Sequence, residues 1–547
     1  MKSKRLTLSV LFVVAAVANA LACTNLIVGK NASADGSTIV SYSADSYGLF
    51  GELYHYPAGM HKKGTLIDIH EWDTGKYLGQ IAQARQTYNV IGNMNEFQLT
   101  IGETTFGGRP ELVDTTGIID YGSLIYLGLQ RSRTAREAIK VMTELVQEYG
   151  YYSSGESFTI ADPNEIWIME MIGKGPGVRG AVWVAVRVPD DCISAHANQS
   201  RIHQFNMNDK ENCMYSPDVI SFAREKGYFD GVNKDFSFAN AYAPLDFGAR
   251  RYCEARVWSY FNMFTDRGNE FLPYILGETN TPMPLFVKPN RKVSVQDVKN
   301  AMRDHYEGTP LDISKDFGAG PYHTPYRLSP LSFKVGDREY FNERPISTLQ
   351  SGFVFVAQMR SELPDPIGGV LWFGTDDANM TVFTPVYCCT DKVPVCYTRV
   401  DGADYITFSW NSAFWIFNWV ANMVYPRYDL MIDDVRATQT ELETTFNEAQ
   451  EGVEAAAAKL LEKDPAKAKA FLTNYTNMTA QSTFDTWKRL GEFLVVKYND
   501  GVVKRMKNGQ FERNSIGQPA GVIRPGYPKE FLEEYVKQTG DRYKMPE

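Results

Sequence analysis

The chain has 547 residues, of which 44% are apolar and 22% are charged, as in an ordinary globular protein with enough length for a large core. The net charge of −9 is modest and unclustered, so nothing in it points to a nucleic acid or a membrane surface as a partner. Aromatic residues make up 13% of the chain, which argues against disorder over most of its length.

The first 22 residues have the pattern of a secretory signal peptide. A basic start that contains Lys2 is followed by an apolar run over residues 6–17 and by Ala20-Leu21-Ala22, an A-x-A cleavage site. The run is shorter than the roughly 20 residues of a membrane span. We therefore expect an exported protein, periplasmic or secreted, that signal peptidase matures and that has no stable insertion in the membrane.

The residue after this cleavage site is Cys23, and a cut after Ala22 would give it a free α-amine beside its thiol. The ordinary pKa is about 7.7–8.0 for an α-amine and about 8.5 for a thiol, so the amine can take the thiol proton near neutral pH. A nucleophile and a base on one residue predict an acyl-transfer catalyst.

A lipoprotein signal also places a cysteine directly after small residues. That machinery prefers a branched aliphatic residue three positions before the cysteine, where this chain has Ala20, so lipoprotein anchoring is the less favoured interpretation. Acylation of the α-amine of Cys23 would remove the base and leave a non-catalytic lipoprotein.

The mature chain begins with a predicted hairpin. Two extended segments, residues 23–28 and 37–43, flank a turn-rich segment that contains Asp35-Gly36. Asp45 follows the end of the second strand. Because the strands of a hairpin are antiparallel, we expect Asp45 to lie close to Cys23 at the same end of the pair.

Strands dominate the next part of the chain, as far as residue 200. They are predicted for residues 88–96, 99–104, 157–161, 165–171, 181–188 and 193–198. Thr134-x-x-Glu137 is a capping box that begins a helix ending at Gly150. This order predicts stacked sheets flanked by helices, an α+β or layered α/β architecture.

The second half of the chain continues this pattern and then becomes helical. Residues 294–306 predict a helix capped by Ser294, and residues 351–359 and 369–373 predict strands. Beyond residue 425 the sequence is rich in Ala and Glu, and Asp464-Pro465 is typical of a helix start. We expect a helical C-terminal extension that serves as a solvated cover or as a contact in a homo-oligomer. The predicted parts are a signal peptide (1–22), a catalytic domain (23–425) and the helical extension (426–547).

Seven cysteines are too few for a disulfide scaffold in a chain of this length. An exported protein could pair some of the six that follow Cys23, and Cys388 or Cys389 with Cys396 could close a short loop, but the sequence does not fix the connectivity. Neither paired C-x-x-C units nor an HExxH motif occurs in the sequence, so we expect no metal.

Several motifs follow one another in an order that resembles a known superfamily. Cys23-Thr24, Asp35-Gly36-Ser37-Thr38 and Asp45 resemble the N-terminal nucleophile (Ntn) hydrolases. The closest resemblance is to peptidase family C69, the PepD-type dipeptidases, which are related to the choloylglycine hydrolases and penicillin V acylases. Four downstream segments extend it over residues 23–425: Asn95-Glu96, His196-Ala197-Asn198-Gln199, Arg250-Arg251-Tyr252 and residues 302–310.

The resemblance implies a four-layer αββα sandwich with Cys23 at the end of a central strand. It implies that Cys23 is the nucleophile and that Asp45 holds the ammonium of Cys23 in place. Asn95 and Asn198 would donate hydrogen bonds to the oxyanion of the tetrahedral intermediate, where one donor is worth roughly 3 kcal/mol in an enclosed site. The resemblance implies no cofactor.

Two questions about the charge near the thiol stay open. Arg251 would polarise the thiolate by resemblance, and Arg256 is a competing candidate for that role. Relatives carry an Arg three residues before the aspartate, where this chain has Tyr42. Another cation must then support the thiolate, or the chemistry of the site differs.

The favoured hypothesis is an exported cysteine-type hydrolase that cleaves amide bonds in dipeptides or short peptides. The alternative is a hydrolase of N-acyl amides that resembles bile-salt hydrolases and penicillin acylases. A dipeptidase needs an acidic group for the ammonium of its substrate, whereas an acylase needs an apolar funnel. Residues 302–310, which are typical of the dipeptidases, favour the first reaction. His305 in this segment is expected to be packed rather than catalytic, because the α-amine already supplies the base.

Overall fold

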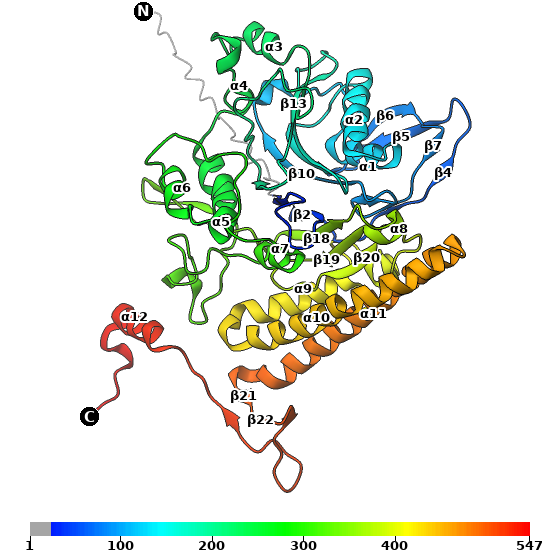
Figure 1. Ribbon diagram of the computed structural model, residues 1–547. Helices are drawn as coiled ribbons and strands as arrows, with labels where there is room; N and C mark the ends of the chain where they lie inside the picture. The colour runs from blue at the N-terminus through cyan, green and yellow to red at the C-terminus, as the bar shows by residue number, and fades with distance from the viewer. Residues whose placement is uncertain (1–22) are drawn as a thin grey trace, which may run out of the picture.

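The computed structural model describes residues 23–547, so the predicted signal peptide over residues 1–22 lies outside the described residues. Helices and strands are mixed along the chain, and most strands pair with antiparallel neighbours in two large sheets. The predicted α+β class is therefore confirmed. Figure 1 shows the two sheets in the middle of the molecule, with helices on both sides.

The first large sheet has six strands and contains the predicted N-terminal hairpin. Ile27 pairs with Val40 and Val28 with Ile39, and the bridge between Thr24 and Ser43 extends this pairing to the residue after Cys23. In spatial order the strands are β14 (Ile193–His196), β1 (Asn25–Val28), β2 (Thr38–Asp45), β18 (Ser351–Met359), β19 (Val370–Thr375) and β20 (Thr384–Tyr387).

The second large sheet has eight strands and is antiparallel wherever its strands pair. It contains the predicted strands between residues 88 and 188, and its central strands are buried on both faces. In spatial order the strands are β15 (Cys213–Tyr215), β13 (Ala181–Arg187), β12 (Ile166–Gly173), β11 (Gly155–Ala161), β10 (Thr100–Gly107), β9 (Met94–Asn95), β8 (Val90–Ile91) and β3 (His55–Tyr56).

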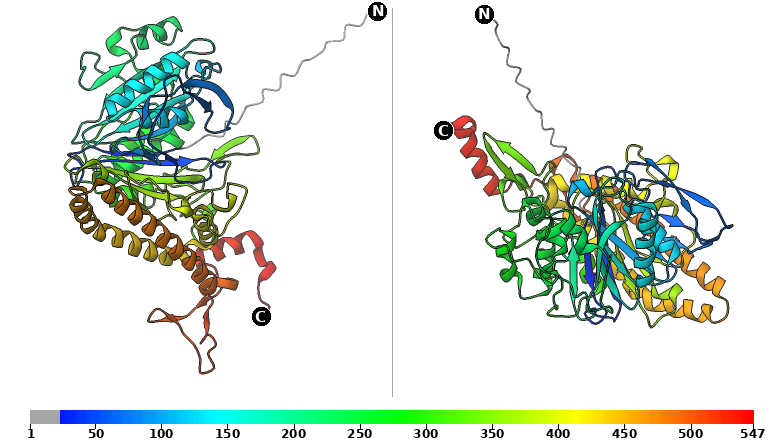
Figure 2. Two further views of the ribbon diagram at one scale, coloured as in Figure 1. Left: turned by 90° about the vertical axis from the view of Figure 1, so that its right-hand side faces the viewer. Right: turned by 90° about the horizontal axis from the view of Figure 1, so that it is seen from above.

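The two sheets face each other, and each carries helices on its outer face. Strands β1 and β2 of the first sheet contact β10 and β11 of the second. Helices α1 (Tyr121–Arg131) and α2 (Ala135–Tyr149) cover the eight-stranded sheet, as Figure 2 shows from two further sides. Thr134 caps α2 as the sequence predicts, because its side chain accepts a hydrogen bond from the backbone N–H of Glu137.

The outer face of the six-stranded sheet is covered by α9 (Ala413–Val424), α10 (Tyr428–Leu461) and α11 (Pro465–Tyr498). Trp487 of α11 stacks on Phe417 of α9 with ring centroids 4.8 Å apart, and both side chains belong to the main apolar core. Arg303 and Glu443 form a buried ion pair that ties α10 to the segment after helix α7 (Val295–Met302). Residue 425 therefore does not separate two cores, and α10 and α11 complete the core that residues 23–425 begin.

The remaining elements surround this core. Ser294 and Asp297 form a capping box at the start of α7, which ends four residues before the predicted limit of 306. The other helices are α3 (Val219–Glu225), α4 (Phe238–Tyr242), α5 (Ala255–Phe264), α6 (Gly268–Ile275), α7 (Val295–Met302), α8 (Asp365–Gly368) and α12 (Lys529–Thr539). Short ladders pair β4 (Gly59–Met60) with β7 (Gln86–Thr87), β5 (Leu66–His70) with β6 (Tyr77–Ala82) and β16 (Ser332–Val335) with β17 (Arg338–Phe341).

The C-terminal segment after α11 extends away from the two sheets (Figure 1). It contains only short ladders and α12, and no residue of α12 is buried. Phe531 of α12 stacks on Phe317 at 5.9 Å, which holds the helix against one exposed turn. The ladders pair β21 (Val503–Lys504) with β24 (Val522–Ile523) and β22 (Met506–Lys507) with β23 (Gln510–Phe511).

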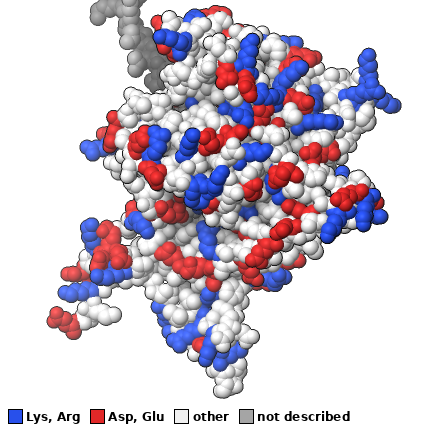
Figure 3. Space-filling model, viewed as in Figure 1, with Lys and Arg blue, Asp and Glu red and all other residues white. Residues whose placement is uncertain are grey.

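Positive and negative side chains are interspersed on the face of the molecule that Figure 3 shows. Within residues 23–547, no helix combines the length and the apolar composition that crossing a bilayer requires. All seven cysteines lie in this part of the chain and are free thiols, so the short loop considered between Cys388 or Cys389 and Cys396 is not closed by a disulfide.

Candidate active site

Cys23 lies at the start of the β1–β2 pairing, where the hairpin register brings it beside the end of β2. Its side chain is buried, and the backbone N–H of Asp45 donates a hydrogen bond to its Sγ. The pairing of Thr24 with Ser43 fixes this arrangement, because the next residues outward along the two strands must then meet. The structure thus brings together two of the predicted site residues, Cys23 and Asp45.

The Asp45 carboxylate is held by a buried ion pair. Arg344 Nη2 lies 2.5 Å from Asp45 Oδ2, and both side chains are nearly inaccessible to solvent. The hydroxyl of Ser351 donates to Asp45 Oδ1 at 2.6 Å. Arg344 lies 299 positions from Asp45 in the chain, in a loop before β18, and no local signal in the sequence could have identified it.

A second buried arginine holds the backbone of Cys23. Arg256 of α5 donates from Nη1 to the Cys23 carbonyl at 2.6 Å and to Thr24 Oγ1 at 2.8 Å. Its Nη2 donates to the carbonyl of Ala197 at 3.0 Å and to Asn198 Oδ1 at 2.9 Å. Burial and the nearby charge of Arg344 lower the pKa of Arg256 to about 10, so it remains cationic at neutral pH.

Arg251, the arginine chosen from the sequence, is directed elsewhere. It lies in a π-helical turn, Ala249–Glu254, and forms an ion pair with Glu343. Its guanidinium also lies 5.1 Å from the ring centroid of Phe341. The arginine that contacts Cys23 is therefore Arg256, the competing candidate, and this corrects the placement of Arg251.

The two predicted oxyanion donors lie in different parts of the fold. Asn198 has a left-handed backbone with φ of 65°, receives a hydrogen bond from Arg256, and donates from Nδ2 to the carbonyl of Thr105 at 2.8 Å. The guanidinium of Arg256 thus bridges Asn198 Oδ1 and the carbonyl oxygen of Cys23.

Asn95, by contrast, stabilises a turn. Its Nδ2 donates to the carbonyls of Leu129 and Ser132, each at 2.8 Å, and its Oδ1 accepts from the backbone N–H groups of Phe97 and Leu99. The structure does not bring Asn95 to Cys23, because its Oδ1 stabilises the β9–β10 turn and its Nδ2 ties this turn to the end of α1.

A carboxylate that the sequence analysis did not identify lies next to the thiol. The Cys23 Sγ lies 3.4 Å from Glu103 Oε1 and 3.8 Å from the Tyr42 hydroxyl oxygen. The Tyr42 hydroxyl donates to Glu103 Oε1 at 2.7 Å. Glu103 reaches this position because Gly102 lets β10 approach β1 closely, and a Cβ at Gly102 would lie only 2.5 Å from Asn25 Oδ1.

Glu103 has a second carboxyl group, that of Glu156, as its neighbour. Both side chains are about 1% exposed, and Thr105 Oγ1 donates to Glu156 Oε1 at 2.8 Å. Burial and the proximity of Glu103 raise the pKa of Glu156 well above its ordinary range, and burial raises the pKa of Glu103. The two carboxyl groups also form a hydrogen bond with each other, which requires one of them to carry a proton, so the pair shares a proton. The signal in the sequence was a Glu within each of two strands that are buried on both faces.

The surroundings of Cys23 favour the protonated thiol. Burial raises the pKa of Cys23 well above its ordinary value, and the charges of Glu103 and Asp45 raise it further. The hydrogen bond from the Asp45 backbone and the contact with the Tyr42 hydroxyl lower this pKa. A positive charge close to the sulfur would favour the thiolate, and a free α-amine on Cys23 would supply one.

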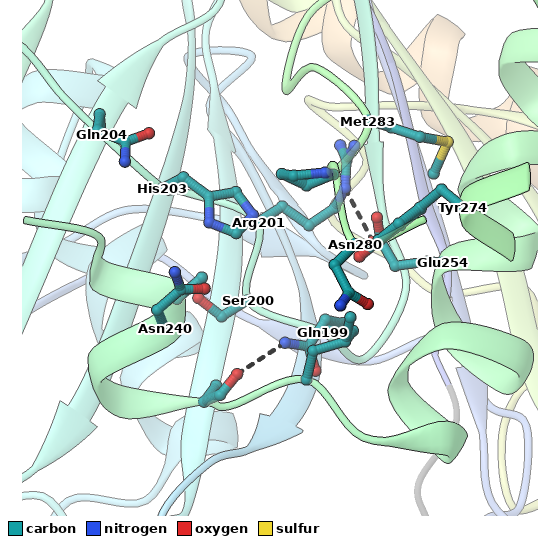
Figure 4. A pocket seen from close by; sticks show the side chains of 14 residues that line it. Gln199, Ser200, Arg201, His203, Gln204, Asn240, Glu254, Tyr274, Asn280 and Met283 are labelled. Atoms are coloured by element: carbon teal, nitrogen blue, oxygen red, sulfur yellow. Dashed lines mark hydrogen bonds and ion pairs between the residues drawn. The ribbon is translucent and has the colours of Figure 1, made fainter. Parts of the chain in front are cut away.

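A polar cavity of about 190 Å³ lies beside the site and is drawn in Figure 4. The chain that follows Asn198 forms one wall of it, and Cys23 is not among its lining residues. Arg201 and Glu254 point toward each other in the figure, with Arg201 Nε 2.9 Å from Glu254 Oε1. The charges in this cavity are thus already paired within the protein.

His305 is packed, as the sequence analysis expected. Its ring is buried against Tyr326 with centroids 4.7 Å apart, and its Nδ1 lies 2.8 Å from Glu307 Oε1. In the part of the chain that the structure describes, no group of three or more His, Cys, Asp or Glu side chains is placed to hold a metal ion.

Comparison with known proteins identifies the family. The model of peptidase family C69 matches residues 22–55 and 50–441. A protein from Salmonella dublin named "Probable dipeptidase" is 30% identical over 395 residues, which are 67% of this chain and 81% of the relative. A "Probable dipeptidase" from Latilactobacillus sakei is 25% identical over 429 residues, covering 74% and 82% of the two chains. A "Dipeptidase" from Bifidobacterium longum is 25% identical over 418 residues, covering 68% and 72%. The chain therefore belongs to peptidase family C69, and it is a hydrolase that acts on peptide bonds.

Proposed function

We propose that this protein is an exported Ntn hydrolase that uses Cys23 to cleave the peptide bond of dipeptides or short peptides. The observation that carries the proposal is the position of Cys23. It directly follows the predicted cleavage site, its Sγ accepts a hydrogen bond from Asp45, and its carbonyl is held by Arg256. This is how a nucleophile would be held if its own α-amine had to serve as the base.

The proposed reaction begins when the cut after Ala22 converts the amide nitrogen of Cys23 into an amine. This amine takes the thiol proton, and the thiolate attacks the carbonyl carbon of the substrate. Asn198 is the one predicted oxyanion donor that lies beside the site, and Arg256 fixes its carbonyl oxygen. The ammonium of Cys23 then protonates the leaving amine as the peptide C–N bond breaks, and water hydrolyses the resulting thioester to release the acid and the thiol.

The arrangement of layers supports the assignment to the Ntn superfamily. Helices α1 and α2 cover one sheet, α9 to α11 cover the other, and the inner faces of the sheets contact each other through β1, β2, β10 and β11. We infer that this order is the αββα sandwich that the sequence resemblance implies. Cys23 precedes β1, which is an interior strand of its sheet, as the resemblance also implies.

The carboxylates around the thiol favour a dipeptide over an N-acyl amide. Glu103 and Asp45 are buried near Cys23, and Glu156 is buried beside Glu103, whereas the substrate of an acylase requires an apolar surface there. The three relatives described above are named dipeptidases, which supports the same choice.

Three forms of the protein test the proposed nucleophile and base. The mature form should begin at Cys23, the second form should be Cys23→Ser, and the third should retain Ala22 before Cys23. We expect hydrolysis of a dipeptide panel by the mature form only, because the second form lacks the thiol and the third lacks the free amine. The matched control is Cys192→Ser, another buried cysteine, which should stay active. Equal activity of the Cys23→Ser protein would refute the assignment.

Export and processing are tested on the protein released by its host. Mass spectrometry of the N-terminus should find an unmodified Cys23 as the first residue. An acylated Cys23 would instead support the lipoprotein alternative and would leave no base for the proposed reaction.

A further inference from the structure

Glu103 and Glu156 differ from the other buried acids near the site in having no cationic partner. Asp45 is paired with Arg344, and Glu254 is paired with Arg201. Within residues 23–547, neither Glu103 nor Glu156 forms an ion pair with a Lys or Arg, and their Oε2 atoms receive no hydrogen bond from any other residue besides the one that the two carboxyl groups form with each other. A buried carboxylate without a cation is costly, so a fold that keeps one gains from a ligand that supplies the cation.

The distance from Glu103 to the thiol defines where that cation would lie. Glu103 Oε1 is 3.4 Å from Cys23 Sγ. In a near-attack complex the carbonyl carbon of the substrate lies about 3–3.5 Å from the sulfur. The α-nitrogen of the residue that carries this carbonyl is two bonds away, at about 2.5 Å. Glu103 is therefore within reach of the substrate's α-ammonium when the carbonyl of its first residue is attacked.

We propose that Glu103, supported by Glu156, binds the α-ammonium of the substrate and thereby selects peptides with a free amino terminus cleaved after their first residue. This inference rests on the proposed function, because it places the scissile carbonyl at Cys23. Tyr42 orients the Glu103 carboxylate by donating to Oε1, and Thr105 orients Glu156. An N-acylated substrate would leave the carboxyl pair without its cation.

The protonation of the carboxyl pair is consistent with this role. The pair shares a proton when it is empty, since burial raises both pKa values. An ammonium beside Glu103 would compensate the negative charge that the pair retains. The cation of the substrate thus completes an arrangement that the protein leaves incomplete.

The α-ammonium of Cys23 is the alternative cation that Glu103 would bind. Substrates that differ only in their amino group distinguish binding of the substrate's ammonium from binding of the ammonium of Cys23. The first experiment uses the mature wild-type protein with Ala-Ala, N-acetyl-Ala-Ala and propionyl-Ala, which is Ala-Ala without its amine. We expect kcat/KM to fall by at least about 100-fold for both analogues, because a site built to bind a polar group rejects substrates without it. Similar rates for Ala-Ala and propionyl-Ala would overturn the proposal without any variant.

The second experiment assigns the selectivity to Glu103. In Glu103→Gln, the ratio of kcat/KM for Ala-Ala to that for propionyl-Ala should fall by about 100-fold, mainly through the KM for Ala-Ala, because any effect of the lost charge on the Cys23 thiol is common to both substrates. Glu103→Asp should recover part of the preference for Ala-Ala. If Glu103→Gln lowers the rates for all substrates equally, Glu103 serves the amine of Cys23 or the fold, and the proposal is wrong. Failure of the proposed function can be distinguished from failure of this inference about Glu103, because it would appear as full activity of Cys23→Ser.

Discussion

The hydroxyl of Tyr42 donates a hydrogen bond to Glu103 Oε1 at 2.7 Å, and the same oxygen lies 3.4 Å from the Sγ of Cys23. This contact gives a physical account of the position where the sequence departs from the family pattern. Tyr42 is neutral, so it does not compensate the charge of Glu103, and the arginine that contacts Cys23 is Arg256, which donates to the backbone carbonyl of Cys23. The charge balance of the site thus differs from that expected with an arginine at residue 42.

Tyr42→Phe tests this contact, because it removes one hydroxyl and keeps the ring between Phe353 and Phe355. The Tyr42 hydroxyl lowers the pKa of the Cys23 thiol, so its loss should raise that pKa. We expect kcat/KM to fall by about 10-fold, in line with the loss of one buried hydrogen bond. The rate of alkylation of Cys23 by iodoacetamide, measured against pH, should shift toward higher pH.

Tyr260→Phe is the control for this substitution. It removes another buried hydroxyl, which donates to the carbonyl of Ile27 at 3.3 Å. An alkylation profile that is the same in wild type and Tyr42→Phe, or that shifts equally in Tyr260→Phe, would contradict a specific role of Tyr42.

Substitution of Arg256 and substitution of Arg251 should have opposite effects on activity. Arg256 makes five hydrogen bonds in a buried position, including one to the carbonyl of Tyr252, and lysine cannot reproduce this planar fork. Arg256→Lys should therefore lower kcat/KM by at least about 10-fold. Arg251→Lys should keep near wild-type activity, because Arg251 pairs with Glu343 away from the thiol.

Steady-state kinetics of the two variants at one pH provide the measurement, and a thermal melt of each establishes that it is folded. Loss of activity in Arg251→Lys with a normal Arg256→Lys would show that the contacts described here do not carry the function.

The sequence predicted the local part of the site and missed the part built by tertiary contacts. The β1–β2 hairpin and the proximity of Asp45 to Cys23 follow from alternating apolar residues, a turn and antiparallel pairing. Glu103 reaches Cys23 from a strand 80 residues away, and Arg344 reaches Asp45 from 299 residues away. A Glu within each of two buried strands marks Glu103 and Glu156 as unusual, but no local pattern shows that Glu103 contacts Cys23 or that Arg344 contacts Asp45.

Two further differences between the sequence-based predictions and the structure have identifiable physical causes. The π-helical turn Ala249–Glu254 shifts the helical phase just before α5, so spacing alone could not decide between Arg251 and Arg256. The Ala- and Glu-rich composition after residue 425 suggested a solvated extension. Phe446 and Trp487 nevertheless form part of a buried stripe on α10 and α11, and this stripe covers the six-stranded sheet.

The ion pair between Asp45 and Arg344 predicts a large effect on stability. Both side chains are buried, and removal of one partner would leave the other as an uncompensated charge. Asp45→Asn should therefore lower the free energy of unfolding by about 3–5 kcal/mol. The measurement is urea denaturation of the mature protein, with the slope of the unfolding free energy compared between variants.

A double-mutant cycle with Arg344→Met isolates the pair. If the ion pair carries the effect, Asp45→Asn combined with Arg344→Met should cost less than the sum of the single changes. Strict additivity would mean that Ser351 and the backbone, rather than Arg344, account for the stabilisation by Asp45.

Glu443 predicts a dependence of stability on acidic pH. This α10 residue pairs with Arg303 and accepts a hydrogen bond from the backbone N–H of Phe383. Burial opposes its ionisation, but the charges of Arg303 and Lys299 outweigh burial and lower the pKa of Glu443 to about 2. The ordinary value for Glu is about 4.3, so the unfolded chain binds more protons between these two values. Stability from this group is present above about pH 4.3 and is lost as the pH falls toward 2.

Glu443→Gln isolates this contribution. The difference in unfolding free energy between wild type and Glu443→Gln should be largest at pH 6 and should shrink by up to about 3 kcal/mol between pH 5 and pH 2. Glu448→Gln, on the same helix and without an ion pair among the described residues, is the control and should show no such change. A wild-type advantage over Glu443→Gln that stays constant down to pH 2 would mean that α10 is held to the sheet by its apolar stripe alone. The observed pair predicts instead that acid loosens the contact of α10 with the Arg303 segment, because protonation of Glu443 leaves Arg303 without its buried counterion.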